Sequence, residues 1–120
     1  MCGIVGIVDP KQNATQIKQS LLRMTDRIIH RGPDDCGVHA QHGAGIGMRR
    51  LSIIDLAGGH QPIGNETGSI QVVCNGEIYN FVELRKDLLS RGHVFQTGSD
   101  TEVIVHLYEE YGDKFLQHLR

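Results

Sequence analysis

The sequence contains no long hydrophobic run. The apolar stretch behind Met1 is broken by Gly3 and Gly6 and is followed by Asp9 and Pro10, and no basic residues precede it. A membrane-spanning helix needs about 20 consecutive apolar residues, and a secretory signal needs a basic leader. We therefore expect a cytoplasmic protein with neither a membrane span nor a membrane partner.

An excess of charge of one sign is also missing. The 12 Lys and Arg residues nearly balance the 14 Asp and Glu residues, so the formal net charge is -2, and the basic residues are scattered along the chain. A nucleic-acid interface requires a basic patch or stripe on one face. We therefore expect no nucleic-acid partner.

Cysteine is sparse, and its spacing forms no pairs. The three cysteines are Cys2, Cys36 and Cys74, without a C-x-x-C pair. This odd count argues against a disulfide framework and against a standard zinc site. The group closest to a metal-ligand pattern consists of His30, Cys36, His39 and His42. Because its spacing matches no four-ligand template, we expect free thiols and no metal.

The first predicted elements are a strand and a helix. The β-branched run "GIVGIVD" at residues 3–9 predicts a strand. An apolar stripe at helical spacing predicts an amphipathic helix over about residues 15–30, with Asn13 or Thr15 as its N-cap. The stripe comprises Ile17, Leu21, Met24 and Ile28. We expect all of it, Met24 included, in the core.

The middle of the chain predicts further strands. Residues 36–41 and 44–55 are typical of two strands joined by a turn, and residues 56–69 are typical of a loop. Residues 69–80 predict another apolar strand, interrupted at Asn75-Gly76 by a common hairpin signal.

The last third of the chain predicts helices. Asn80 and Glu83 resemble a capping box that opens a helix ending at Gly92. A second helix begins near residues 99–100 and ends at Gly112, and a short amphipathic piece follows it. The irregular alternation of strands and helices predicts an α+β fold, and the chain length suits one small domain.

Cys2 has chemistry that depends on its position. If Met1 is removed, Cys2 carries a thiol and an α-amine on the same Cα. An α-amine ordinarily has a pKa of about 7.7–8.0, so it can act as a general base for the thiol through one water molecule. From its position alone, Cys2 could equally be a small apolar residue at the start of a buried strand.

A cysteine nucleophile that attacks an amide also needs donors for the oxyanion. Asn75 and Gly76 offer a side-chain amide and an accessible backbone N–H. Most Asn-Gly pairs are simply turns, so this pair leaves both interpretations open.

Ordered blocks along the chain decide between these interpretations. The blocks are "MCGIVGI" at 1–7, "HRGPDD" at 30–35, "RRLSIIDLAGGHQPI" at 49–63, "NGEIYNF" at 75–81 and "GSDTEVIVHLYEEYG" at 98–112. Together they resemble the N-terminal glutaminase domain of class II glutamine amidotransferases. The nearest group in that family is the glutamine-hydrolysing asparagine synthetases of the B type.

The resemblance implies that Cys2 attacks the side-chain amide of L-glutamine, releases ammonia and leaves a thioester that water hydrolyses to glutamate. It implies an oxyanion hole made by the Asn75 side chain and the Gly76 N–H. The implied glutamine-binding residues are Arg50, Leu51, Ser52, Ile53, Ile54, Asn75, Gly76, Glu77 and Asp100. Arg50 would pair with the α-carboxylate, and Glu77 and Asp100 would surround the α-ammonium. Arg31 and Gly32 would support the Cys2 terminus.

The resemblance also implies a fold and a larger enzyme. The fold would be an N-terminal-nucleophile (Ntn) hydrolase αββα sandwich of antiparallel sheets, and residues 1–120 would be an N-terminal part of it, incomplete at the C-terminus. The missing synthetase domain would use Mg-ATP to make asparagine from aspartate, whereas the glutaminase step would need no cofactor. A homodimer stays open as a partner arrangement.

Two alternatives remain at this point. The ammonia acceptor could be a sugar phosphate or phosphoribosyl pyrophosphate, as in other class II enzymes. The chain could instead be a non-catalytic module that binds glutamine or a partner protein.

Overall fold

A computed structural model describes residues 1–51 and 59–120, which form two compact units. Unit 1 consists of Met1–Pro62 and Val73–Asn75, and unit 2 of Ile63–Val72 and Gly76–Arg120. The chain therefore passes from one unit to the other at three points, so neither unit is a single consecutive segment.

The sheet of unit 1 has three antiparallel strands. They are β1 (Gly3–Val8), β2 (Asp35–Gln41) and β3 (Ala44–Arg50), in the order β1-β3-β2. Gly43 has a φ of 79° in the tight turn between β2 and β3, a conformation that glycine adopts without steric cost. The predicted strands are thus confirmed as far as residue 50, and residues 52–55 of the third prediction lie outside the described residues.

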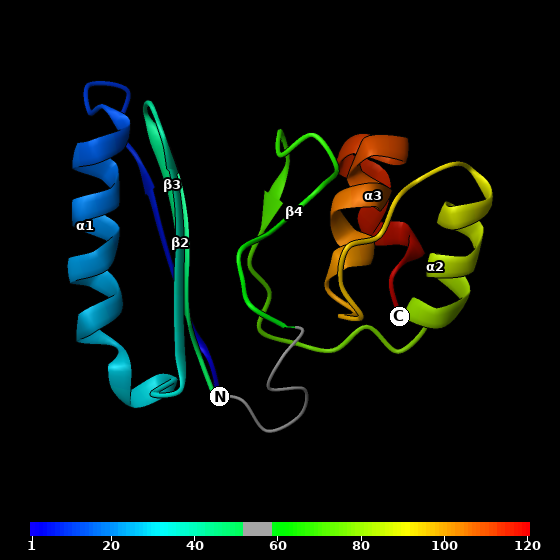
Figure 1. Ribbon diagram of the computed structural model, residues 1–120, viewed down its shortest axis with the longest axis horizontal. Coiled ribbons are helices and arrows are strands. Elements are labelled where there is room, and N and C mark those ends of the chain that lie inside the picture. The colour runs from blue at the N-terminus through cyan, green and yellow to red at the C-terminus, as the bar shows by residue number, and fades with distance from the viewer. Residues whose placement is uncertain (52–58) are drawn as a thin grey trace. The chain divides into compact units, whose positions relative to one another are not determined.

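Helix α1 (Ala14–Arg27) covers one face of this sheet (Figure 1). Asn13 is its N-cap: the Asn13 side chain accepts from the Gln16 N–H, and the Gln16 side chain accepts from the Asn13 N–H. Ile17 and Leu21 are fully buried against Val5 of β1. The amphipathic helix is confirmed, and Asn13, not Thr15, caps it.

The prediction for Met24 is wrong. Its exposed fraction is 36 %, whereas that of Thr25 is 0 %. The sheet covers the side of α1 that carries Leu21 and Thr25, and Met24 lies at the other edge of the apolar stripe. Thr25 tolerates burial because its hydroxyl donates to the Leu22 carbonyl oxygen at 2.8 Å.

Unit 2 contains a second, small antiparallel sheet. Its strands are β4 (Ile63–Gly64) and β5 (Gln71–Val72). The predicted loop therefore contains a short strand, and the strand predicted over residues 69–80 is only two residues long. No strand follows Asn75-Gly76, so the hairpin prediction is wrong. Beyond β5, Cys74 bonds to the Gln61 side chain in place of a neighbouring strand.

The helices of unit 2 enclose its hydrophobic core. They are α2 (Phe81–Ser90), α3 (Glu102–Tyr111) and the 3₁₀ segment η2 (Gly112–His118) (Figure 1). The buried core residues are Ile78, Leu88, Val103 and Leu107. The predicted ends are confirmed, since Gly92 and Gly112 have φ values of 99° and 53° just beyond the two helices.

The predicted starts of these helices need correction. Asn80 occupies the N-cap position of α2 but makes no capping bond. Its side chain instead donates to the His118 carbonyl oxygen at 2.8 Å and accepts from the Arg120 N–H at 3.0 Å. Helix α3 begins at Glu102, slightly later than predicted, and the carboxylate of Asp100 accepts from the Ile78 N–H at 2.7 Å. In both cases a partner distant in sequence replaces the local cap.

The structure is therefore α+β with antiparallel sheets. Unit 1 is a helix on a three-stranded sheet, connected to β2 by the 3₁₀ turn η1 (Ile29–Arg31). Across residues 1–51 and 59–120, no helix has the length and apolar character needed to cross a bilayer.

Candidate active site

Cys2 lies immediately before β1, beside the end of β3. The antiparallel register pairs Gly3 with Arg49, so the residue before β1 meets the residues that follow β3. The Leu51 N–H donates to Cys2 Sγ at 3.5 Å. The Cys2 thiol therefore lies beside a backbone donor at the end of β3.

Asn75 reaches the same residue from a distant part of the chain. Its side-chain Nδ2 donates to the Cys2 backbone carbonyl oxygen at 3.4 Å. The Asn75 side chain is otherwise exposed, so its amide is open to a ligand. Of the residues predicted for the site, the structure thus brings Cys2, Leu51 and Asn75 together.

Gln61 holds the segment before Asn75. Its side-chain Oε1 accepts from the Cys74 N–H at 2.7 Å, and its Nε2 donates to the Cys74 carbonyl oxygen at 3.3 Å. Gln61 is 7 % exposed, so these bonds are shielded from water. The sequence analysis missed this residue because a single glutamine in a loop carries no local signal.

Arg50 is the last residue of β3, and backbone hydrogen bonds fix its position. It pairs with Asp35 in the sheet, and its carbonyl oxygen accepts from the Asp34 N–H at 3.1 Å. Its guanidinium lies against Gly59, where an added Cβ would come within 2.5 Å of Arg50 Cζ. Gly59 therefore leaves space for the guanidinium, a second contribution that the sequence analysis did not single out.

Gly32 and Arg31 lie behind this region. A Cβ added at Gly32 would overlap the backbone of Arg49 and lie 2.5 Å from the Arg50 nitrogen. Only glycine allows this close approach of η1 to the end of β3. The Arg31 Cβ lies 3.2 Å from the position of a Cβ on Gly3, the residue after Cys2. Gly32 thus packs against the end of β3, and Arg31 lies beside the first residue of β1.

The remaining predicted site residues either lie outside the described residues or belong to unit 2. Ser52, Ile53 and Ile54 lie outside the described residues. Gly76, Glu77 and Asp100 belong to unit 2, where Gly76 and Glu77 are exposed and Asp100 holds the Ile78 N–H.

One further pair near the end of β3 was not predicted. His60 Nδ1 and Asp35 Oδ2 lie 2.8 Å apart, with side-chain exposed fractions of 66 % and 32 %. Such an exposed pair contributes little to stability, and it identifies no chemistry by itself.

Comparison with known proteins identifies the family of this chain. A family model described as "Glutamine amidotransferase domain" matches residues 1–120, so the chain belongs to the glutamine amidotransferase domain family. It is 44 % and 48 % identical to the glutamine-hydrolysing asparagine synthetases 3 and 2 of Bacillus subtilis, and 43 % identical to that of Zea mays. Each match covers 99 % of this chain but only 20 %, 16 % and 20 % of the relative, respectively. The chain therefore spans about a fifth of the length of these relatives and corresponds to their N-terminal region.

Proposed function

We propose that this domain hydrolyses L-glutamine to glutamate and ammonia, with Cys2 as the nucleophile. The observation that carries the proposal is the meeting of Cys2 with the Leu51 N–H and the Asn75 side chain at the paired ends of β1 and β3. A thiol with nearby amide donors, in a member of this family, suits attack on a carboxamide.

The reaction requires a free α-amine at Cys2. Met1 is 76 % exposed, so its peptide bond is accessible to an aminopeptidase. After its removal, the amine accepts the thiol proton through a water molecule, and Sγ attacks the side-chain carbonyl carbon of glutamine. The C–N bond then breaks, the nitrogen takes up the proton and leaves as ammonia, and a thioester remains. Water attacks the thioester, which releases glutamate and restores the thiol.

The remaining roles follow the family resemblance. The Asn75 amide and the Gly76 N–H stabilise the oxyanion, and Arg50 pairs with the α-carboxylate of glutamine. Glu77 and Asp100 bind the α-ammonium, and the backbone from Leu51 to Ile54 lines the substrate. Glutamine is zwitterionic, so both signs of charge are needed. No metal or cofactor enters this step.

We further propose the context of this domain. The ammonia serves ATP-dependent asparagine synthesis from aspartate in a cytoplasmic full-length enzyme, where a synthetase domain binds Mg-ATP. The names and lengths of the relatives support this proposal. The layered arrangement of helix and antiparallel sheet in unit 1 is compatible with the αββα sandwich of N-terminal-nucleophile hydrolases.

The test uses the full-length enzyme and its Cys2→Ala variant. We expect the variant to lose glutamine-dependent synthesis and glutamate release while it retains synthesis from free ammonia, because only the nucleophile is removed. The intact mass of the active wild-type protein should lack Met1. Equal loss of both activities would make Cys2 a structural residue, and retained Met1 in active protein would exclude the α-amine as base.

A further inference from the structure

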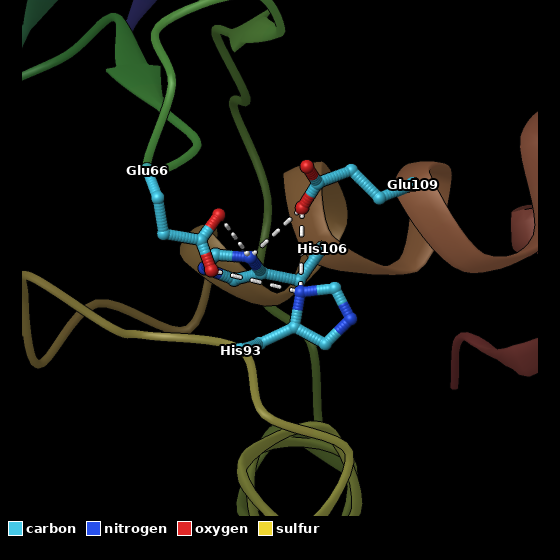
Figure 2. Close-up of side chains that lie close together, drawn as sticks. All are labelled: Glu66, His93, His106 and Glu109. Atoms are coloured by element: carbon cyan, nitrogen blue, oxygen red, sulfur yellow. Dashed lines mark hydrogen bonds and ion pairs between the residues drawn. The ribbon is translucent and has the colours of Figure 1, made fainter.

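Four side chains that the proposed glutaminase does not use converge within unit 2. They are Glu66, His93, His106 and Glu109, and one ligand-type atom from each lies within 4.8 Å of all the others. Figure 2 shows both carboxylates directed at the ring nitrogens of the two histidines. Among residues 1–51 and 59–120, this is the only such group of three or more histidine, cysteine or acidic side chains. The group around Cys36 considered in the sequence does not form one.

We propose that these four residues bind a divalent transition-metal ion of the zinc type. A tetrahedral zinc ion lies about 2.0–2.2 Å from nitrogen and oxygen ligands, which places the ligands about 3.3–3.5 Å from one another. Here His93 Nδ1 and His106 Nδ1 each lie 3.3 Å from Glu109 Oε2. Glu66 places its two carboxylate oxygens 3.7 Å and 3.5 Å from the same two nitrogens, respectively. With Glu66 Oε2 as the ligand atom, three of the six edges of a tetrahedron are therefore already near their required lengths.

The outward-facing nitrogens of the histidines support this arrangement. His93 Nε2 lies 2.9 Å from Glu110 Oε1, so a proton on Nε2 would leave the Nδ1 lone pair for a metal ion. His106 Nε2 is buried without a hydrogen-bond partner among the described residues, and its nearest recorded carboxylate oxygen is Glu102 Oε1 at 3.7 Å. A carboxylate hydrogen-bonded to the outer nitrogen, as Glu110 is to His93, is the usual way in which proteins orient a metal-bound imidazole.

The two carboxylate ligands are also held in place. Glu66 Oε1 accepts from the Val94 N–H at 2.7 Å, and Glu109 Oε1 accepts from Asn65 Nδ2 at 2.7 Å. These bonds fix the positions of both carboxylates beside the histidines.

The charges of the group call for a cation. Glu66, Glu102, Glu109 and Glu110 surround two imidazoles. Arg91 pairs with one of these four carboxylates, that of Glu110, at 3.4 Å. With neutral imidazoles, the two ligand carboxylates alone carry the charge that one divalent ion neutralises. The two histidines are shielded, with side-chain exposed fractions of 0 % for His106 and 11 % for His93, whereas the two glutamates are partly exposed, at 27–28 %.

The proposed ion would stabilise unit 2. Its ligands come from the β4–β5 hairpin, from the loop after α2 and from α3. One ion would thus connect three segments around the core, and Phe95, whose ring centroid lies 4.4 Å from that of His106, provides an apolar wall. All four positions of the tetrahedron are filled by protein, which is typical of structural zinc sites and not of catalytic ones.

The test is Co²⁺ and Zn²⁺ titration of the metal-free full-length protein without a histidine tag. We expect one Co²⁺ with the visible absorption of tetrahedral nitrogen and oxygen coordination, displacement of that ion by Zn²⁺, and a rise in Tm with Zn²⁺. Glu66→Gln and His93→Gln should abolish the tetrahedral absorption and the rise in Tm. Glu110→Gln should lower the affinity about 10–100-fold. His42→Gln, at an exposed turn, is the matched control and should bind as the wild type does.

Glu66→Gln should keep the fold, because the amide oxygen of glutamine can still accept from the Val94 N–H. Circular dichroism checks the fold of each variant. No tetrahedral absorption in the wild type would overturn the proposal. Equal binding by the wild type and by folded Glu66→Gln and His93→Gln would also overturn it. Neither outcome depends on glutaminase activity.

Discussion

Asn75 is the residue whose predicted role the structure makes most specific. Its side chain lies at Cys2 and has no buried packing role, so its removal should affect the transition state more than the fold. In the full-length enzyme, Asn75→Ala should lower the kcat of glutamine hydrolysis about 10²-fold or more with little change in KM. Steady-state glutamate release measures both constants. Unchanged ammonia-dependent synthesis is the internal control, and a rise in KM alone would show that Asn75 binds glutamine without stabilising the oxyanion.

Arg50 should give the opposite kinetic pattern. A lysine in its place keeps the positive charge but loses the planar pair of donors that suits a carboxylate. Because one charged hydrogen bond contributes about 1.5 kcal/mol or more, Arg50→Lys should raise the KM for glutamine about tenfold, with a smaller effect on kcat. The same assay distinguishes the two variants, and a fall in kcat at constant KM would contradict the assignment of Arg50 to the substrate carboxylate.

At the scale of elements, helix α1 depends on its capping box. Asn13→Ala removes an acceptor from the Gln16 N–H, so it should lower the free energy of unfolding by about 1 kcal/mol. Thr15→Ala is the matched control, since Thr15 is exposed within the first turn and caps nothing; its effect should stay within about 0.5 kcal/mol. Urea denaturation measures both. Equal effects would show that the capping bonds of Asn13 contribute nothing.

A substitution at the contact between η1 and β3 should lower stability more than the loss of the α1 cap does. Gly32→Ala forces a Cβ into the backbone of Arg49, so one of the two elements must move. We expect a loss of stability of at least about 1–3 kcal/mol, together with reduced glutaminase activity, because Arg50 and Leu51 follow directly. Gly98→Ala, where nothing lies within 4 Å of the added Cβ, is the control in denaturation and glutamate-release assays. Normal stability of Gly32→Ala would contradict the close packing of Gly32 against the backbone of Arg49.

At the scale of the whole molecule, removal of divalent cations should separate two activities. The proposed chemistry at Cys2 uses an amine and amide donors, so glutamate release should persist in chelator well below the Tm. ATP-dependent synthesis should stop, because ATP acts as its Mg²⁺ complex, and added Mg²⁺ should restore it. Parallel loss and recovery of glutamate release would show that the glutaminase step also needs the metal.

Some features of this protein follow from the sequence alone, because they depend on residues close together in the chain. The alternating run at 3–9 defines β1, and spacings of three and four define α1. Gly92 and Gly112 end the helices because glycine, unlike other residues, readily adopts the positive φ found at these two positions. The ordered blocks likewise identify the family, since they are read without knowledge of any contact.

Other features were decided only by tertiary structure. The Asn75-Gly76 pair forms no hairpin because Cys74 bonds to Gln61, and Asn80 caps no helix because its amide bonds to the C-terminal segment. Leu51 and Asn75 meet Cys2 only because strand register and loop path bring them there. The four-residue group in unit 2 escaped sequence reasoning for the same reason: only His106 and Glu109 are helical neighbours. Contacts across dozens of residues depend on packing, which local periodicity does not encode.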